Sequence, residues 1–472
     1  MMKTLLRAAP ALLLAATVQA QPLPPSSPPA EADPVLAGLI RESLARRPEL
    51  RQADALVSAE RERAPQAGAF QDPVLTLGIQ NDGFNGLQIG KMETSWWQVM
   101  ITQPLSWPGK RGLRSDVAST GVRIAEASVG RARLTAEADV RRAYLDLLLV
   151  RDRLGLLTRL EALWVKAEGL ARNRYEASQG AQSDILRAQL ERNRLRQRRW
   201  ALEAEHRTRL QAVNRLRAHP LDEPLDTPAS VRALGLPALP VAATAQADAE
   251  RRSPELLVAR LQAERAGQQV ALARRERYPD FAVTAAIMPR GSIEPMWAAG
   301  ISMTLPVFSA SKQGRAVAES EAWAEAGSSG AEAVLQLLRL RVEERQSLLA
   351  SLLESGQLYR DGLIIQSQAT ADSTLHQYRV GRVGFASVLE AIAGVIGDED
   401  GYLQTVAAAQ RVAIATGEVS LDAGGGGGGA LSSGSVPGAG AVGGGGGGSA
   451  SASATASGGG DAGSSSSSMV KM

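Results

Sequence analysis

The side chains that could carry out chemistry in this 472-residue chain are few and widely separated. The absence of cysteine excludes disulfides, thiolate metal sites, a cysteine nucleophile and a lipid anchor on an N-terminal cysteine. His206, His219 and His376 are too scattered to form a metal-ligand motif. The stretch "GKRG" (109–112) is too short for a phosphate-binding loop, and no serine–histidine–aspartate arrangement stands out. The sequence therefore predicts neither an enzyme nor a bound cofactor.

A passage from strand-like to helix-like sequence occurs twice. "ITQPLSWPGKRGLR" (101–114) and "MTLPVFSASKQGR" (303–315) both run from alternating residues through proline to a lysine and a glycine. The matching residues are Pro104 and Lys110 in the first passage and Pro306 and Lys312 in the second, with Pro108 present only in the first. Proline cannot donate a ladder hydrogen bond, so we predict that each strand ends there. The lysines should then lie where the chain leaves a membrane for water.

Two more motifs recur at nearly the same spacing. "RRPEL" (46–50) returns as "RRSPEL" (251–256), 206 residues later. "YEASQGAQSDILRA" (175–188) returns as "YRVGRVGFASVLEA" (378–391), 203 residues later, and the lysine passage returns after 202. Three motifs at a near-constant offset indicate a tandem duplication. The predicted organisation is a first repeat at 34–219, a proline-rich linker at 220–245 and a second repeat at 246–420.

The two ends of the chain differ from the repeats. Residues 1–20 have the charged start, apolar stretch and small residues of an export signal, although a buried N-terminal helix is the alternative. Residues 21–33 form a proline-rich segment, and 421–472 form a Gly/Ser-rich tail that we expect to be disordered. After the signal no run of eighteen apolar residues appears, so a membrane-spanning helix is not expected.

Long helices are predicted wherever proline is missing. No proline occurs at 109–219 or 307–436, and an interior proline would cost a helix about 3 kcal/mol. In the first gap apolar residues follow steps of three and four, the spacing of one helix face: Val140, Tyr144, Leu147, Val150, Leu154, Leu157, Leu160 and Trp164. We predict helices at 112–177 and 184–217, and in the second repeat at 313–380 and 385–417.

Four strands are predicted just before the long helices, as the pairs 72–80 with 95–105 and 278–288 with 295–307. Each has about ten residues, enough to cross a bilayer at a tilt. Four strands cannot close a barrel, and an open sheet edge in lipid leaves backbone groups unsatisfied. Several copies must therefore contribute strands to one pore. The alternative is two ordinary hairpins packed on helices.

Overall charge gives no sign of a nucleic-acid partner. Fifty-two basic residues nearly balance 49 acidic ones, for a formal net charge of +3. The field needed to attract a polyanion is therefore not implied.

Together the duplicated hairpin-plus-long-helix unit, the "QPLSWPGKRG" passage and the tyrosine motifs make residues 34–420 resemble a TolC-type outer-membrane efflux protein. The resemblance implies a mainly α fold with a membrane β-barrel: a homotrimer with a twelve-stranded barrel in outer-membrane lipid, continued by a coiled-coil α-helical tunnel in the periplasm. It also implies a periplasmic adaptor and an inner-membrane pump, RND-type, as partners, with passive export through this component. The "PGKRG" form resembles the subgroup that serves heavy-metal exporters.

The resemblance also assigns residues to a constriction at the periplasmic tip. The family's acidic positions match Asp184 and Arg187 in the first repeat and Ser387 and Glu390 in the second, where an aspartate is usual in place of Ser387. A ring of Glu390 residues could attract cations. The alternative for Asp184 and Glu390 is an ordinary solvated helix face.

The turns at the tip are implied to contact the adaptor. Gly180, Gly381 and Gly384 are expected to allow the helix break, because glycine tolerates positive φ. A plain helix–helix turn would use the same glycines. The competing function is a periplasmic coiled-coil structural or adaptor protein, although such adaptors carry one helical hairpin and no membrane-length strands.

Overall fold

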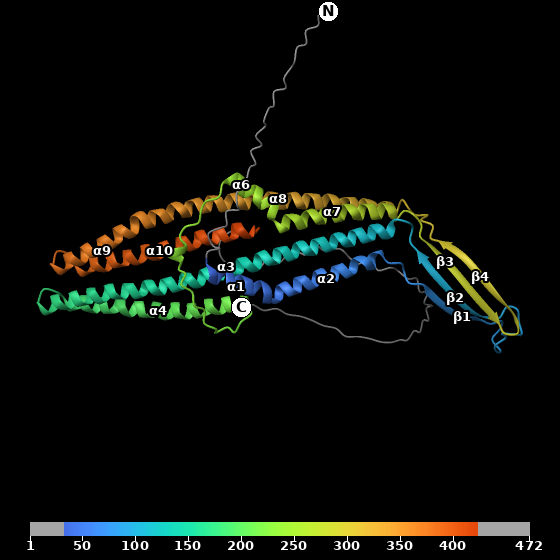
Figure 1. Ribbon diagram of the computed structural model, residues 1–472, viewed down its shortest axis with the longest axis horizontal. Helices are drawn as coiled ribbons and strands as arrows, with labels where there is room; N and C mark the ends of the chain where they lie inside the picture. The colour runs from blue at the N-terminus through green and yellow to red at the C-terminus, as the bar shows by residue number, and fades with distance from the viewer. Residues whose placement is uncertain (1–32, 423–472) are drawn as a thin grey trace, which may run out of the picture. The chain divides into compact units, whose positions relative to one another are not determined.

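The computed structural model describes residues 33–422 (Figure 1). The predicted export signal (1–20), nearly all of the proline-rich segment and the tail from residue 423 lie outside the described residues. Two units with the same order of elements follow one another: each has two helices, a β-hairpin, a long helical segment and a returning helix. This repeated order of elements is what a tandem duplication would produce, and the predicted repeat bounds stay a prediction.

The first unit begins with two helices that the sequence reading did not foresee, α1 (Pro34–Arg46) and α2 (Pro48–Gly68). Both start at a proline, which is favoured in the first helical turn because its missing N–H has no partner there anyway. Asp33 caps α1 by accepting from the backbone N–H of Val35 at 2.9 Å. Helix α2 continues past Pro65, so an interior proline did not end it.

The long helices agree with the sequence prediction. Helix α3 (Lys110–Glu176) has 67 residues, a length of about 100 Å at 1.5 Å per residue. The chain turns and returns through α4 (Gln182–Leu216). In the second unit, α8 (Gln313–Leu358) and α9 (Ile364–Arg379) take the place of α3, and α10 (Phe385–Glu418) takes the place of α4.

One feature of the second unit was not predicted. A single π-helical turn, η2 (Tyr359–Leu363), joins α8 to α9 without interrupting the helical path. A π-helical turn inserts one extra residue into an α-helix, and such turns often occur at functional sites. The extra residue also accounts for the shift of the repeat offset from 202 at Lys110 and Lys312 to 203 at Tyr175 and Tyr378.

The four strands form one antiparallel sheet in the order β1-β2-β3-β4. They are β1 (Val74–Gln80), β2 (Trp96–Leu105), β3 (Phe281–Arg290) and β4 (Ile293–Met303). Both predicted hairpins are present, and β2 pairs with β3 to join them, with Val99 opposite Ile287. Strand β4 ends at Met303 instead of reaching the predicted residue 307.

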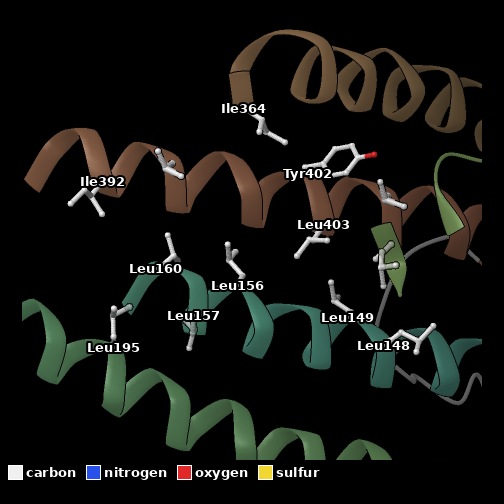
Figure 2. Packing of buried hydrophobic residues seen from close by; sticks show 14 of the residues in the cluster. Leu148, Leu149, Leu156, Leu157, Leu160, Leu195, Ile364, Ile392, Tyr402 and Leu403 are labelled. Carbon is white, nitrogen blue, oxygen red and sulfur yellow. The ribbon is translucent and has the colours of Figure 1, made fainter. Parts of the chain in front are cut away.

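The hydrophobic core lies between the long helices. Helix α3 packs against α1, α2, α4, α7 and α10. Figure 2 shows leucines of α3 facing Leu195 of α4 and Ile392, Tyr402 and Leu403 of α10. The predicted apolar stripe of α3 is buried apart from Leu154, which is half-buried. Because other faces of α3 are buried too, the helix is central and not only amphipathic.

The segment between the units is packed and not loose. It holds α5 (Val231–Leu234) and leads to α6 (Ala242–Arg252) and α7 (Pro254–Arg275). The Val231 side chain is fully buried, and its backbone N–H donates to Asp152 of α3 at 2.8 Å. Arg151 donates to the carbonyl oxygen of Thr227 at 2.5 Å. The proline-rich segment therefore packs across α3 and is held there by hydrogen bonds.

Candidate functional site

The tips of the two helical hairpins are joined through one buried tyrosine. Tyr378, at the end of α9, is 1% exposed. Its hydroxyl donates to the Oδ2 of Asp184 at 3.0 Å, in the first turn of α4. Its ring also meets the ring of Phe385 edge-on, with centroids 5.3 Å apart. A side chain of the second repeat is thus bonded to the first repeat at the predicted constriction.

Arg174, near the end of α3, makes a second link between the tips. Its guanidinium donates to the carbonyl oxygen of Tyr378 at 2.9 Å and to that of Gln179 at 2.8 Å. It also lies 4.7 Å from the centroid of the Tyr378 ring, a cation–π contact. Sequence reasoning missed Arg174. The available signal was its difference from Gln377, which stands at the matching place in the second repeat.

The proton of Tyr378 is held firmly. Burial, followed by the hydrogen bond to Asp184, raises the pKa of Tyr378 to about 12. A phenol with this pKa keeps its proton at neutral pH and remains a hydrogen-bond donor. The link to Asp184 is therefore available throughout the physiological pH range.

The predicted constriction residues do not behave alike. Asp184 is half-buried and bonded to Tyr378, so it is not a free carboxylate in this state. Arg187, Ser387 and Glu390 are exposed, and their side chains make no hydrogen bond or ion pair within the described part of the chain.

The tip turns use glycine differently from the prediction. Gly381 has the expected positive φ of 78°, but Gly384 is the N-cap of α10 with an ordinary φ of −79°. In the first turn the positive φ of 54° belongs to Ser178 and not to Gly180. Gly180 is needed for space instead, because an added Cβ would lie 3.0 Å from the Cβ of Arg174.

The first strand-to-helix passage is a buried polar junction. Lys110, 3% exposed, donates through Nζ to the carbonyl oxygen of Tyr278 at 2.7 Å and to Oδ1 of Asp280 at 2.9 Å. The same Asp280 oxygen accepts from the backbone N–H of Trp107 at 2.8 Å. Gly109, with φ of 90°, lets the chain turn directly into α3. Lys110 thus fastens the first repeat to the second instead of facing water.

The second passage lacks such a junction. Lys312 is exposed and has no ion-pair partner among residues 33–422. Pro306 lies beyond the end of β4, whereas its counterpart Pro104 is paired with Ala282 inside the sheet. Pro104 does not end its strand: β2 continues to Leu105, and the exposed Pro108 follows outside the sheet. The two passages, alike in sequence, differ in surroundings.

The two faces of the sheet differ sharply. Since side chains alternate along strands, odd-numbered residues share one face here and even-numbered residues share the other. The odd face is apolar and exposed: Leu75, Leu77, Ile79, Trp97, Val99, Ile101, Val283, Ile287, Trp297, Ile301 and Met303. The even face is mixed: it carries the small or polar residues Thr76, Gly78, Gln98, Thr102, Thr284, Ala298, Gly300 and Ser302, together with Val74, Trp96, Met100, Met288 and Met296. An apolar exposed face of this extent marks contact with lipid or a partner.

The described part of the chain has neither a candidate metal site nor a helix that could span a membrane. Between residues 33 and 422, no group of three or more potential ligands could hold a metal ion. No helix in that range is both long and apolar enough to cross a membrane.

Comparison with known proteins identifies the family of this chain. The sequence model of the family described as outer membrane efflux protein matches residues 39–219 and 246–415. A sequence search of curated proteins found no match.

Three solved outer-membrane proteins share the fold. The outer-membrane channel OprN is 21% identical with a TM-score of 0.68, covering 82% of this chain and 90% of its own. VceC from Vibrio cholerae is 18% identical with a TM-score of 0.66, covering 81% and 95%. MtrE from Neisseria gonorrhoeae, solved in an open state, is 18% identical with a TM-score of 0.63, covering 82% and 89%. The chain belongs to the outer membrane efflux protein family and is an outer-membrane efflux channel, not an enzyme, with its helical part in the periplasm.

Proposed function

We propose that three copies of this chain form one export duct, in which twelve strands make the membrane wall and the long helices make a periplasmic tunnel. The observation that carries this proposal is the sheet, whose odd-numbered face is apolar and exposed, whereas most of its polar and small residues lie on the even-numbered face. A transmembrane barrel needs this alternation, with apolar side chains toward lipid and polar ones toward the lumen. A soluble adaptor would have no reason to expose the apolar face to water.

Transport through the duct is passive. The sequence contains no phosphate-binding loop of the GxxxxGK type. We propose that an inner-membrane pump of the RND type supplies the energy, and that a periplasmic adaptor contacts the tip turns around Gly180, Gly381 and Gly384. The cargo is small molecules or ions, with drugs and heavy metals as the two classes to test.

The gate lies at the tips in this proposal. The Tyr378–Asp184 hydrogen bond and the Arg174 contacts hold the two hairpins of one chain together. Opening requires the hairpins to separate, so these contacts favour the closed state. An open state is named for MtrE, which shares the fold. Three copies of the exposed Glu390 around the tunnel axis would give a negative ring that favours cations.

Planar-bilayer recording tests this function. The purified full-length protein should insert as a pore that prefers cations, and the Glu390→Gln variant should lose much of that preference, read as a smaller reversal potential across a salt gradient. Ser387→Ala serves as the uncharged control at the neighbouring exposed position and should leave the reversal potential unchanged. Protein that never conducts would refute the duct, whereas conduction with an unchanged reversal potential in Glu390→Gln would refute the ring alone.

A further inference from the structure

We propose that the groove between the start of α3 and the end of α7 binds the headgroup of a membrane phospholipid, a phosphodiester that carries a primary ammonium group. In this assignment Arg275 and Arg274 hold the phosphate, and Asp116 holds the ammonium. The inference rests on the proposed function, because it requires the sheet to lie in a membrane. It adds a ligand site that passage through the duct does not itself require.

The groove is a surface hollow of about 630 Å³ beside the junction of sheet and helices. Its size falls within the range of about 300–1,000 Å³ that is usual for small-ligand sites. Gly112 keeps the α3 side open, because a Cβ added there would meet no atom within 4 Å. The lining residues that bear on binding are Gly109, Gly112 and Asp116 from the α3 side and Arg274, Arg275 and Tyr278 from the α7 side.

The groove lies at the level where strands give way to helices. Tyr278 stands three residues before β3 begins at Phe281, which is at most about 11 Å of extended chain. Its ring stacks on that of Trp107, with centroids 5.5 Å apart and planes inclined by 14°. Tyrosine and tryptophan gather at the headgroup layer of a membrane, because their rings are apolar and their polar atoms reach water. A phospholipid headgroup is therefore a ligand that this groove would meet.

Arg275 is held in place and still has unused donors. Its Nε donates to the carbonyl oxygen of Pro108 at 3.1 Å, and its guanidinium carbon lies 5.1 Å from the centroid of the Tyr278 ring. A Cβ added to Gly109 would lie 3.2 Å from its Nη2, so the guanidinium rests against bare backbone. Its two terminal nitrogens have no acceptor within residues 33–422. A fixed guanidinium with two free nitrogens matches the paired oxygens of a phosphate.

The neighbouring charges fit a ligand that carries both signs. Arg274 donates to Glu321 at 2.7 Å, but the Arg274 side chain is 63% exposed, and exposed ion pairs contribute little. It is therefore free to turn to a phosphate. Asp116 is exposed on the α3 wall, and its carboxylate makes no hydrogen bond or ion pair in the described part of the chain. A bare phosphate would be repelled by this carboxylate, whereas the ammonium of phosphoethanolamine would be attracted to it.

The charged groups are not part of the duplicated framework. Gly112 of α3 matches Gly314 of α8, 202 residues later, so the small residue recurs where the helices begin. The charged and aromatic residues do not recur. Arg274, Arg275 and Tyr278 correspond, 206 residues earlier, to Gly68, Ala69 and Asp72, and Asp116 corresponds to Ala318. Because the matching helices form without these side chains, their presence in one groove favours a ligand over a packing role.

Lipid titration of the full-length protein in mild detergent tests the site. Short-chain phosphatidylethanolamine is added, and bound lipid is counted by native mass spectrometry. We expect one tightly bound lipid per chain, and Arg275→Ala should weaken its binding at least about tenfold, because charge-assisted hydrogen bonds are lost. The matched control is Arg277→Ala, which removes an exposed charge two residues away that does not line the groove. Equal loss in the two variants would show a general basic surface and overturn the site.

Headgroup preference gives a second test, in a variant that loses no contact within residues 33–422. The wild type should prefer phosphatidylethanolamine to phosphatidylcholine, because a quaternary ammonium has no N–H to donate to Asp116. Asp116→Asn should abolish this preference. Inorganic phosphate at the same concentration should not displace the lipid. Displacement by phosphate would assign the groove to a free anion, and a preference that survives in Asp116→Asn would remove the ammonium contact. Either result overturns the assignment.

Conduction separates this inference from the proposed function. Planar bilayers of phosphatidylcholine contain no ethanolamine lipid, and both the wild type and Arg275→Ala should still conduct in them. A protein that conducts but binds phosphatidylethanolamine no better than phosphatidylcholine would refute the site and leave the duct standing. A protein that neither inserts into a bilayer nor binds lipid would refute both.

Discussion

At the scale of single residues, the link between Tyr378 and Asp184 distinguishes the two repeats. Tyr175 occupies the matching place in the first repeat, but its side chain is 47% exposed and makes no hydrogen bond within the described residues. The same residue type therefore locks the tip in one repeat and faces solvent in the other. Only one of the two turns can be released by losing a phenol hydroxyl.

This difference gives a prediction with a built-in control. Tyr378→Phe keeps the ring but removes the donor to Asp184, and a hydrogen bond to a charged group contributes about 1.5–3 kcal/mol. Since 1.4 kcal/mol is about tenfold in an equilibrium, the open probability of the channel should rise at least about tenfold in single-channel recordings at neutral pH. Tyr175→Phe should change nothing. Equal behaviour of the two variants would show that the hydroxyl does not hold the gate.

The sequence matches Lys110 with Lys312, but it does not predict what surrounds either side chain. Lys110 and Lys312 look equivalent, and nothing local reveals that Lys110 is buried while Lys312 is exposed. Lys110 is buried by Asp280 and Tyr278, which approach from about 170 residues away in the chain. Contacts at such separations are set by the joining of β2 to β3, which a single hairpin pattern does not specify.

At the scale of elements, the α3–α4 hairpin is fastened by a buried carboxylate. Glu168 of α3 accepts hydrogen bonds from Arg192 at 2.6 Å and Gln189 at 3.1 Å, both on α4. The hydrogen bond from Arg192, with that from Gln189, lowers the pKa of Glu168 in the folded protein. A lowered folded pKa means stabilisation above the unfolded value, about 4.3, which is lost as the pH falls through the folded value.

The pH dependence of stability tests this fastening. Between pH 7 and pH 3 the midpoint of thermal unfolding should fall further for the wild type than for Glu168→Gln, which has no carboxylate to protonate. Glu176→Gln, at the exposed end of α3 and without an ion pair among residues 33–422, should fall as far as the wild type. A parallel fall in all three proteins would assign the acid sensitivity to other groups.

Packing of α10 against the π-helical turn gives a second prediction at this scale. A Cβ added to Gly401 would lie 2.7 Å from the hydroxyl oxygen of Tyr359 and 2.9 Å from its ring. Gly401→Ala should therefore destabilise by about 1–3 kcal/mol through overpacking. On the same helix a Cβ at Gly397 meets nothing within 4 Å, so Gly397→Ala should stabilise by up to about 1 kcal/mol. Opposite shifts of the thermal midpoint are expected, and a stabilised Gly401→Ala would contradict this packing.

Elements with strong periodic signals were the predictable ones. The proline-free stretches and the apolar stripe of α3 predicted the long helices to within a few residues. Helices α1, α2 and α7 were not predicted, because each starts at a proline and lies outside the proline-free stretches, and α2 continues through Pro65. The early end of β4 could not be predicted, because strand length at a sheet edge depends on a partner outside the chain.

At the scale of the whole molecule, a single chain leaves several surfaces without a partner. Its sheet has two free edges and an exposed apolar face, and its tip residues Arg187, Ser387 and Glu390 face no partner between residues 33 and 422. Each of these features is explained if equal copies surround a common axis. In the proposed trimer the aperture would be formed by residues of several copies, so the contacts within one chain do not define it.

The central claim is that the working unit contains three copies in the outer membrane. The most direct measurement is the mass of the full-length protein extracted from membranes in mild detergent, corrected for bound detergent, with the membrane fraction recorded. We predict a protein mass three times that of the mature chain, recovered from the outer-membrane fraction. A monomer or dimer that stays in solution without detergent would contradict the account, because the four strands would then be ordinary hairpins and no pore could form.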